Sequence, residues 1–426
     1  MFELPSTAPV IEQDDWLFDT NYSEAEAEYL ADTAEELKQM TLKMRRGEFP
    51  HENLYKHGDK GIYLEMDDSD PPYSYAVNDE LLPHWKEFAA ALKQFSPAIN
   101  LLPDDCESCF SCYCVQLNND AMLLIKEALM NKPFKRLSFT HNRNGDDERG
   151  GMSVDVIIDI VESNKHLRKL DIGKNRIGNQ HIERLCSAVH NHPLVELSLD
   201  HSFEPGIGDE MLTALLTNDD LKLEKLDMSW NNITSSVSTL LADFLATNPR
   251  LKELGLNENY LNASDAVSIS NALRSNTILR TLDLGNNSIT DVGVEAFRLV
   301  LCDESSLNSV ADSNHTCVVH PGFRCFSFNK NRSEMVNENR GRKIYSILSS
   351  RNKTLSNVQH FDDIDVKLLP NMIESVQRYS KYESEVPWRK HDSKEVEALS
   401  IVYEVMRKWD KAFPLYKSSG YGNIDT

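Results

Sequence analysis

Leucines and other apolar residues recur along the middle of the chain in one order, Leu-x-x-Leu-x-Leu-x-x-Asn-x-Ile/Leu. The first leucines of five copies are Leu167, Leu194, Leu223, Leu251 and Leu279. The second leucine follows three residues later in each copy, and successive second leucines lie 27, 29, 28 and 28 residues apart. The copy at Leu194 is looser, with Ser202 in place of the Asn and a small insertion after it. Such regular spacing over five copies indicates tandem repeats of one structural unit.

Each repeat contains two periodicities. The Leu-x-Leu pair has period two, which predicts a short strand with one buried face, and the Asn that follows can bond to backbone groups in the turn. The next residues have helical period, as in Ile182, Leu185 and Val189. One strand and one helix cannot close a core, but stacked copies can. The prediction is an α/β leucine-rich-repeat solenoid with a curved parallel sheet inside, helices outside, and helical N- and C-terminal caps.

Further features extend the register. An Asn stands six residues before the second Leu in five copies, where each helix is expected to end; these are Asn131, Asn164, Asn191, Asn248 and Asn276. Because Asn tolerates the left-handed conformation, we expect it to cap the helix C-termini. Weaker copies are expected upstream at Leu137–Phe139 and downstream at Leu307, Val310 and Asp312, which gives about 7–8 copies in all.

The chain divides into three predicted regions. Residues 1–104 are an acidic, largely helical cap or partly mobile arm, with helices from Ser23 to Arg46 and around Trp85–Phe95, and a loop-like segment over 50–83. Residues 105–326 hold the repeats. Residues 327–426 contain three helical segments, about Glu334–Ser349, Val366–Tyr379 and Lys394–Phe413, which form a C-terminal cap or a docking region.

Charge and composition narrow the choice of partner. The formal net charge is −22, with 21 acidic and 8 basic residues over 1–100, and 13 acidic and 17 basic residues over 327–417. Strong negative charge repels phosphate backbones, so we expect no nucleic-acid partner. No apolar run reaches the ~20 residues of a membrane span, so no membrane partner is expected. The first twenty residues contain five acids and no Lys or Arg, which favours a cytoplasmic or nuclear location.

The cysteine cluster Cys106-x-x-Cys109-x-x-Cys112-x-Cys114 has enough thiols for zinc. The repeat offers another explanation, because Cys109, Cys112 and Cys114 fit the three leucine positions, with Cys112 25 residues before Leu137. Free Cys packs as a small apolar residue, and strand residues that face a core cannot readily surround a tetrahedral ion. We therefore expect no metal and no cofactor. Phosphate-binding, dinucleotide-binding, zinc-protease and serine-hydrolase signatures do not occur, so an enzyme is not expected.

Strand–helix repeats of about 28 residues resemble the ribonuclease-inhibitor-like class of leucine-rich repeats. That class includes the ribonuclease inhibitor, the Ran GTPase-activating protein and the repeats of NOD-like receptors. The flanks, including 311–317 and 357–361, resemble those of uncharacterised leucine-rich-repeat proteins of unicellular algae. The resemblance implies an intracellular protein-binding scaffold or adaptor. The alternative is a GTPase-activating regulator similar to the Ran GTPase-activating protein, although the long acidic tail of that family is missing here. Nuclease inhibition has a thinner basis, because the ribonuclease inhibitor has far more cysteine and about twice as many repeats.

In such repeats, strand positions between and after the inner leucines face the concave side. The expected binding residues there are Asp171, Asp200, Asp227, Trp230, Asn257, Glu258 and Asp283. A Trp at an exposed strand position is typical of interface hot spots, and acidic side chains suit a protein partner with a basic or mixed-charge surface. Two explanations without a binding role stay open for these residues: Leu-Asp-Leu is common in such repeats without dedicated binding, and Trp230 could fold over its neighbour. The partner's identity and the oligomeric state are left open.

Overall fold

The computed structural model describes residues 24–52, 60–65, 79–95, 108–113, 115, 117–141, 153–218, 221–321, 329, 336–353, 364–382 and 400–401. The chain forms two compact units, Met1–Ile207 and Gly208–Thr426. Each unit repeats the same order of strand, turn and helix. The predicted region boundaries at 104/105 and 326/327 stay predictions.

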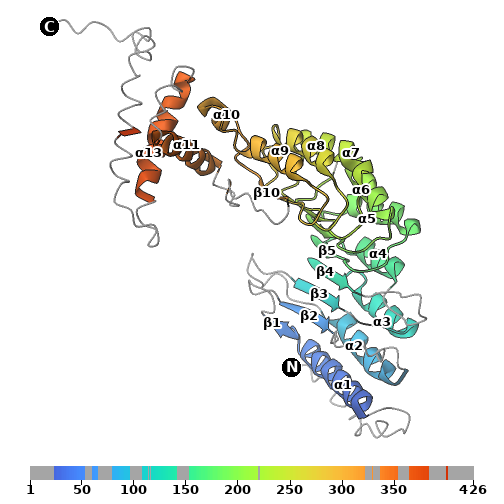
Figure 1. Cartoon of the computed structure of the whole chain (residues 1–426). Helices are drawn as coiled ribbons and strands as arrows, with labels where there is room; N and C mark the ends of the chain where they lie inside the picture. Colours follow the sequence, from blue (N-terminus) through green and yellow to red (C-terminus); the bar gives the residue numbers. More distant parts are fainter. Residues whose placement is uncertain are drawn as a thin grey trace, which may run out of the picture. The chain divides into compact units, whose positions relative to one another are not determined.

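The first unit carries six described strands in chain order. They are β1 (His51–Glu52), β2 (Lys60–Glu65), β3 (Ser108–Tyr113), β4 (Arg136–Thr140), β5 (Lys169–Asp171) and β6 (Glu196–Ser198). β1 pairs antiparallel with β2, and every later pair is parallel. The helices are α1 (Glu24–Arg45), α2 (Leu82–Gln94), α3 (Asn119–Leu129), α4 (Val154–Ser163) and α5 (Ile182–Asn191), with 3₁₀ turns at Asp79–Leu81 and Asn179–His181. Figure 1 shows the helices of this unit along one side of its strands.

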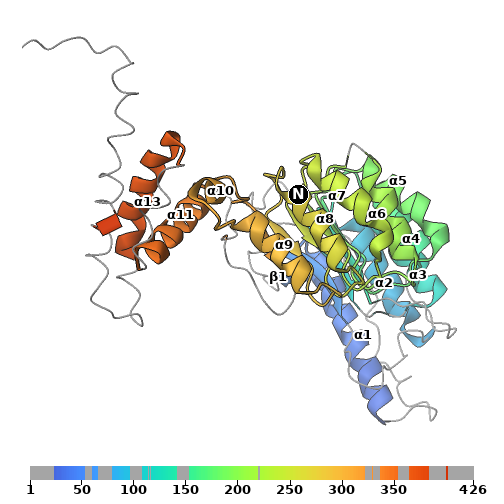
Figure 2. The same cartoon turned by 45° about the horizontal axis from the view of Figure 1, so that its top comes forward.

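The second unit continues the pattern. Its strands are β7 (Lys225–Asp227), β8 (Glu253–Gly255), β9 (Thr281–Asp283) and β10 (Val318–His320), all parallel in the pairs β7–β8, β8–β9 and β9–β10. Its repeat helices are α6 (Ile207–Leu216), α7 (Ser238–Ala246), α8 (Ala263–Leu273) and α9 (Asp291–Leu301), with a 3₁₀ turn at Ser235–Val237. Helices α7, α8 and α9 lie side by side in both views (Figures 1 and 2).

The predicted core positions are buried. The second leucines of the five copies are all at most 2 % exposed, and Phe110, Phe134 and Phe139 replace leucines in the first unit. The Asn of the turn works as expected: Asn259 Nδ2 donates to Met228 O at 3.1 Å and Leu256 O at 3.0 Å, and its Oδ1 accepts from the backbone of the preceding repeat. Together, the strands, helices and bonded turns confirm the α/β leucine-rich-repeat solenoid.

The sequence analysis expects a loop-like segment over residues 50–83, but the structure has a strand in it. Strand β2 lies there and pairs with β3 in the register Ile62 to Phe110 and Leu64 to Cys112. Ile62 and Leu64 have the Leu-x-Leu spacing, but 48 residues separate Ile62 from Phe110, so the regular 28-residue period does not reveal them. The predicted helices are present as α1 and α2, and α1 buries its expected stripe, which is Leu30, Ala34, Leu37, Thr41 and Met44. The expected N-cap, Ser23, lies outside the described residues.

The expected downstream copy is also wrong in register. Residues Leu307–Ala311 form a short helix, α10, and the strand that pairs with β9 is β10, with Val319 opposite Leu282. Ser306 begins α10, because its Oγ accepts from Ser309 N at 3.0 Å. The 28-residue spacing from Leu282 therefore points to a helix, and the strand comes nine residues later than the period predicts.

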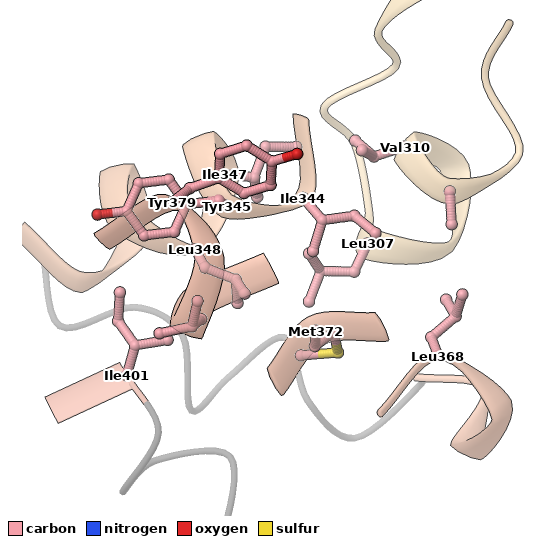
Figure 3. Packing of buried hydrophobic residues seen from close by; sticks show 12 residues of the cluster. Leu307, Val310, Ile344, Tyr345, Ile347, Leu348, Leu368, Met372, Tyr379 and Ile401 are labelled. Carbon is pink, nitrogen blue, oxygen red and sulfur yellow. The ribbon is translucent and has the colours of Figure 1, made fainter. Parts of the chain in front are cut away.

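Two further helices of the second unit follow β10, namely α11 (Val336–Lys353) and α13 (Leu369–Tyr382), the latter preceded by a 3₁₀ turn at Val366–Leu368. They match the first two expected C-terminal segments. Figure 3 shows their buried side chains gathered against α10, with Leu307 and Val310 facing Ile344 and Met372. The third expected segment, Lys394–Phe413, lies almost wholly outside the described residues; of it, Ser400 and Ile401 are helical, and Ile401 is fully buried.

Candidate protein-binding face

The strands present alternate residues to two sides. The leucines point toward the helices, so their neighbours along each strand point the other way. We call that second side the open face; it corresponds to the side that the sequence analysis expects to be concave. Asp171 and Asp200 lie on or beside it in the first unit, and Asp227, Trp230, Asn257, Glu258 and Asp283 in the second.

Three of the predicted aspartates have a structural role in the turn after their strand. Asp171 Oδ1 accepts from Gly173 N at 3.1 Å, Asp227 Oδ1 from Ser229 N at 3.0 Å, and Asp283 Oδ1 from Gly285 N at 3.0 Å. Asp side chains commonly bond in this way to the backbone two residues ahead. These carboxylates hold their turns, so their presence on the open face does not by itself indicate a binding role.

Small residues leave room for these carboxylates on the neighbouring strand. A Cβ atom on Gly255 would lie 2.7 Å from Asp227 Oδ1, and one on Gly173 would lie 2.0 Å from Asp200 Oδ1. Burial raises the pKa of Asp171, and the bond from Gly173 N opposes that shift only in part.

The residue two positions after the third leucine has a left-handed backbone in every described repeat. The six residues, with φ between 51° and 60°, are His141, Lys174, His201, Trp230, Glu258 and Asn286. The backbone N–H of Trp230 donates to Asn257 O at 3.0 Å, and that of Glu258 donates to Gly285 O at 2.8 Å. These bonds to the next repeat hold the strained conformation, which a non-Gly residue adopts only at a cost. Asn286, His141 and His201 belong to residue types that favour this conformation, but Lys174, Trp230 and Glu258 do not, so the residue types alone do not predict the feature.

In the second unit this row forms a rim of varied side chains. Trp230 is 50 % exposed, so it does not fold fully over its neighbour, and Glu258 accepts a hydrogen bond from Asn286 Nδ2. Asn257 lies one residue before Glu258, and its Oδ1 is 2.5 Å from Ser229 Oγ. Tyr260, which the sequence analysis missed, is 60 % exposed close by in the chain. Its signal was an aromatic residue between polar turn residues.

Two lysines at the first position of their strands form ion pairs with glutamates of the adjacent strands. Lys169 Nζ lies 3.0 Å from Glu196 Oε1, and Lys225 Nζ lies 3.2 Å from Glu253 Oε2. Exposed pairs of this kind contribute about 0–1 kcal/mol each. At these two positions the strands present paired charges rather than free basic groups.

The cysteine register differs from the prediction. Phe110, not Cys112, pairs with Leu137, and Cys112 pairs with Phe139. Cys109 and Cys112 are three residues apart in β3, so they point to opposite sides of the strand. Among the described residues no three His, Cys, Asp or Glu side chains gather as a metal site would require. Cys106 and Cys114 lie outside the described residues.

One family model matches parts of the repeat region. The Leucine Rich repeat family matches residues 163–185, 220–236 and 275–297. An internalin from Listeria monocytogenes is similar at 18 % identity over 49 % of this chain and 47 % of that chain, with a TM-score of 0.30, so the match spans about half of the internalin. Actin-binding site 2 of leiomodin-1 is similar at 14 % identity over 50 % of this chain and 98 % of that one, with a TM-score of 0.23. Curated proteins show no significant match.

The chain therefore carries leucine-rich repeats stacked as strand–helix units, an architecture that offers an extended surface for protein binding. None of the helices in the described part of the chain is long and apolar enough to cross a membrane. The ribonuclease-inhibitor-like subclass and the algal flanks stay predictions.

Proposed function

We propose that this chain is an intracellular scaffold or adaptor that binds a protein partner through its open face, with Trp230 as an energetic centre. The observation that carries the proposal is the half-exposed Trp230 side chain on a backbone fixed by a bond to the next repeat. A large aromatic side chain on a rigid backbone loses little entropy on binding, which is why Trp is enriched in hot spots.

The acidic residues define the kind of partner. Glu258 belongs to the same row as Trp230, Asp227 and Asp283 lie on the open face of the second unit, and Asp171 and Asp200 lie on or beside that of the first. Their charge favours a partner surface that is basic or of mixed charge. Since three of the aspartates also hold turns, Glu258 and Asn257 are the better polar contacts, because their contacts are between side chains on the face.

The test replaces Trp230 and Glu258 by Asn, the residue that the chain itself carries at the same position in Asn286. Both variants, Trp230→Asn and Glu258→Asn, should fold, because Asn tolerates the left-handed conformation. Affinity capture from native lysate, read by mass spectrometry, should recover a partner with the wild type that Trp230→Asn loses by at least tenfold. Val292→Asn is the matched control, because Val292 is 67 % exposed on α9, and it should retain the partner. Equal recovery with all three variants would contradict a partner on this face.

The GTPase-activating alternative stays a prediction, and a GTP-hydrolysis assay with a Ran-type GTPase tests it. No described contact favours it over binding alone. The cytoplasmic or nuclear location likewise stays a prediction.

A further inference from the structure

The open face of the first unit contains a cavity of about 340 Å³. Four neighbouring strands, β2 to β5, supply its lining, and the argument depends on Tyr63, Ser111, Tyr113, Arg136, Ser138 and Asp171. The cavity is within the usual size range of ligand pockets.

The strand register explains the hollow. Ser111 on β3 pairs with Ser138 on β4, and these two short side chains form its floor. Tyr63 stands beside Ser111 on β2, with its ring folded back over Gly61, where a Cβ atom would lie 2.6 Å from that ring. Asp171 stands beside Ser138 on β5. Small residues at the centre and larger ones around them leave a built pocket rather than a flat sheet.

Arg136 occupies one end of this pocket, where it forms no ion pair with the described residues, although its charge acts on Asp171. In the same column, Lys169 pairs with Glu196, and the corresponding Lys225 of the second unit pairs with Glu253. Arg136 makes no ion pair or side-chain hydrogen bond with any residue that the structure describes. A guanidinium presents five donors in a fork that fits carboxylate or phosphate oxygens in pairs.

Asp171 does not take that role. One of its oxygens accepts from Gly173 N on its own strand's turn, and burial raises the pKa of its carboxyl group although the Arg136 charge opposes this. The pocket therefore keeps a guanidinium at one end, hydroxyl donors on its floor, and the aromatic side chains of Tyr63 and Tyr113 in its wall.

We propose that this pocket binds an oxyanion, a carboxylate or a phosphate, carried on a side chain of a protein partner. Arg136 holds the oxyanion, Ser111 and Ser138 donate to it, and the tyrosine rings pack against its apolar stem. Naming a protein as the carrier rests on the proposed function. The chain carries a net charge of −22 and repels anions at a distance, so selection depends on contact within the pocket.

The first experiment titrates the full chain with small aromatic probes by ligand-detected NMR. Phenyl phosphate and benzoate stand for the two oxyanion sources, benzamide is the neutral match, and benzylamine is the cationic one. At least one anion should bind with a Kd on the order of 1 mM, and benzamide and benzylamine at least about tenfold more weakly. The stronger of the two anions identifies the source. Binding of benzamide as tight as that of benzoate and phenyl phosphate would overturn the proposal.

Variants then test the residues. Arg136→Gln should weaken anion binding at least about tenfold, Arg136→Lys should weaken it less because the charge remains, and Lys225→Gln, the matched loss of charge in the second unit, should change nothing. Asp171→Asn should tighten anion binding several-fold, because Asn keeps the acceptor for Gly173 N and removes a like charge. If Arg136 and Asp171 only stabilised the fold, their variants would not change the anion affinity in opposite directions.

Equal binding by Arg136→Gln and Lys225→Gln, or weaker binding by Asp171→Asn in a folded protein, would overturn the proposal. Thermal melts by circular dichroism establish that each variant is folded. These probes need no partner protein, so a failure here leaves the Trp230 proposal untouched, and a failure of partner capture leaves this pocket untouched.

Discussion

In the second unit, the interior repeats and the C-terminal end use different residues to donate hydrogen bonds to carbonyls near the helix ends. A carbonyl near the end of each repeat helix needs a donor. Asn276 Nδ2 donates to Leu245 O of α7 at 2.8 Å, and Asn314 Nδ2 donates to Leu273 O of α8 at 2.7 Å. The next carbonyl in this series, Leu301 O of α9, receives its bond from Lys343 Nζ on α11. The three carbonyls are spaced 28 residues apart, so Lys343 continues the series from outside the repeats.

The difference shows how the array can end. An interior helix end is closed by an Asn of the following repeat, whereas the last one is closed by a helix that has no repeat pattern. Lys343 also donates to Asn314 O at 2.8 Å and lies 3.3 Å from His315 Nδ1, so three acceptors surround its ammonium group. We propose on this basis that the described part of residues 327–426 acts as a C-terminal cap. The docking alternative remains a prediction for the residues beyond it.

The largest expected effect is on Asn314 itself. Its side chain makes four buried bonds: Nδ2 to Leu273 O and Asn276 O, and Oδ1 from Thr316 N and Cys317 N. Asn314→Ala leaves these groups unsatisfied, so the free energy of unfolding should fall by about 3 kcal/mol. Urea denaturation followed by circular dichroism measures it. Asn271→Ala, at an exposed position of α8, should change it by less than about 0.5 kcal/mol, and similar losses for both would remove the basis of the comparison.

A smaller effect follows from the titration of Lys343. Burial lowers the pKa of this side chain from 10.5 to about 7. Between those values the unfolded chain binds more protons than the folded one, so raising the pH favours the folded state. The free energy of unfolding should therefore rise by about 1–2 kcal/mol from pH 7 to 8.5. Below pH 7 the cost of the buried charge is fully present.

Lys343→Met is the variant that isolates this rise. It removes the titrating group, so its unfolding free energy should be nearly flat over the same interval. Two other groups contribute less over this interval. Burial and the Lys343 charge lower the pKa of His315 to about 3 from 6.5, which lies below the interval, and burial raises the pKa of the Cys302 thiol from 9.0, which lies above it. A wild-type rise that persists unchanged in Lys343→Met would assign it to another residue.

Much of the repeat array could be predicted because its signals are local. The Leu-x-Leu spacing and the helical period that follows depend only on neighbours in the chain, and they place β4 to β9 correctly. The strand predictions at the two ends of the array are wrong for the same reason. Strands β2 and β10 do not lie one regular period from the next copy. Extending the period therefore does not find the strand at Ile62, and it predicts a strand at Val310 where the structure has one at Val319.

Strand alternation in the sequence predicts which residues lie on the open face, and their role in binding stays a prediction. Strand alternation is enough to place Asp227 and Asp283 on the open face. Their bonds to Ser229 and Gly285, and the left-handed backbone of Trp230, depend on the turn and on the next repeat. Lys343 lies 42 residues from its acceptor at Leu301, in a helix with no repeat signature. The contact between Lys343 and Leu301 therefore cannot be predicted from the repeat period.

The last prediction, which includes the smallest expected effect, concerns the Asn that stands six residues before the second Leu of several copies. We expected each Asn six residues before the second Leu to cap a helix in the left-handed conformation, and Asn131 and Asn248 do so, with φ of 59° and 61°. Asn164, Asn191 and Asn276 do not. Asn164 and Asn276 are buried, and each Nδ2 donates to a carbonyl of the preceding repeat.

Asn248→Gly should consequently change the free energy of unfolding by less than about 0.5 kcal/mol, because Gly favours the left-handed conformation and the lost bonds to Thr277 are exposed. Asn276→Gly should cost about 2–3 kcal/mol, because Leu245 O, Ile278 N and Leu279 N lose a buried partner. Urea denaturation of the two variants in parallel measures the gap. Equal costs would mean that the backbone conformation, and not the bond between repeats, selects Asn at this position; unequal costs would mean that the solenoid uses one residue type for two separate tasks.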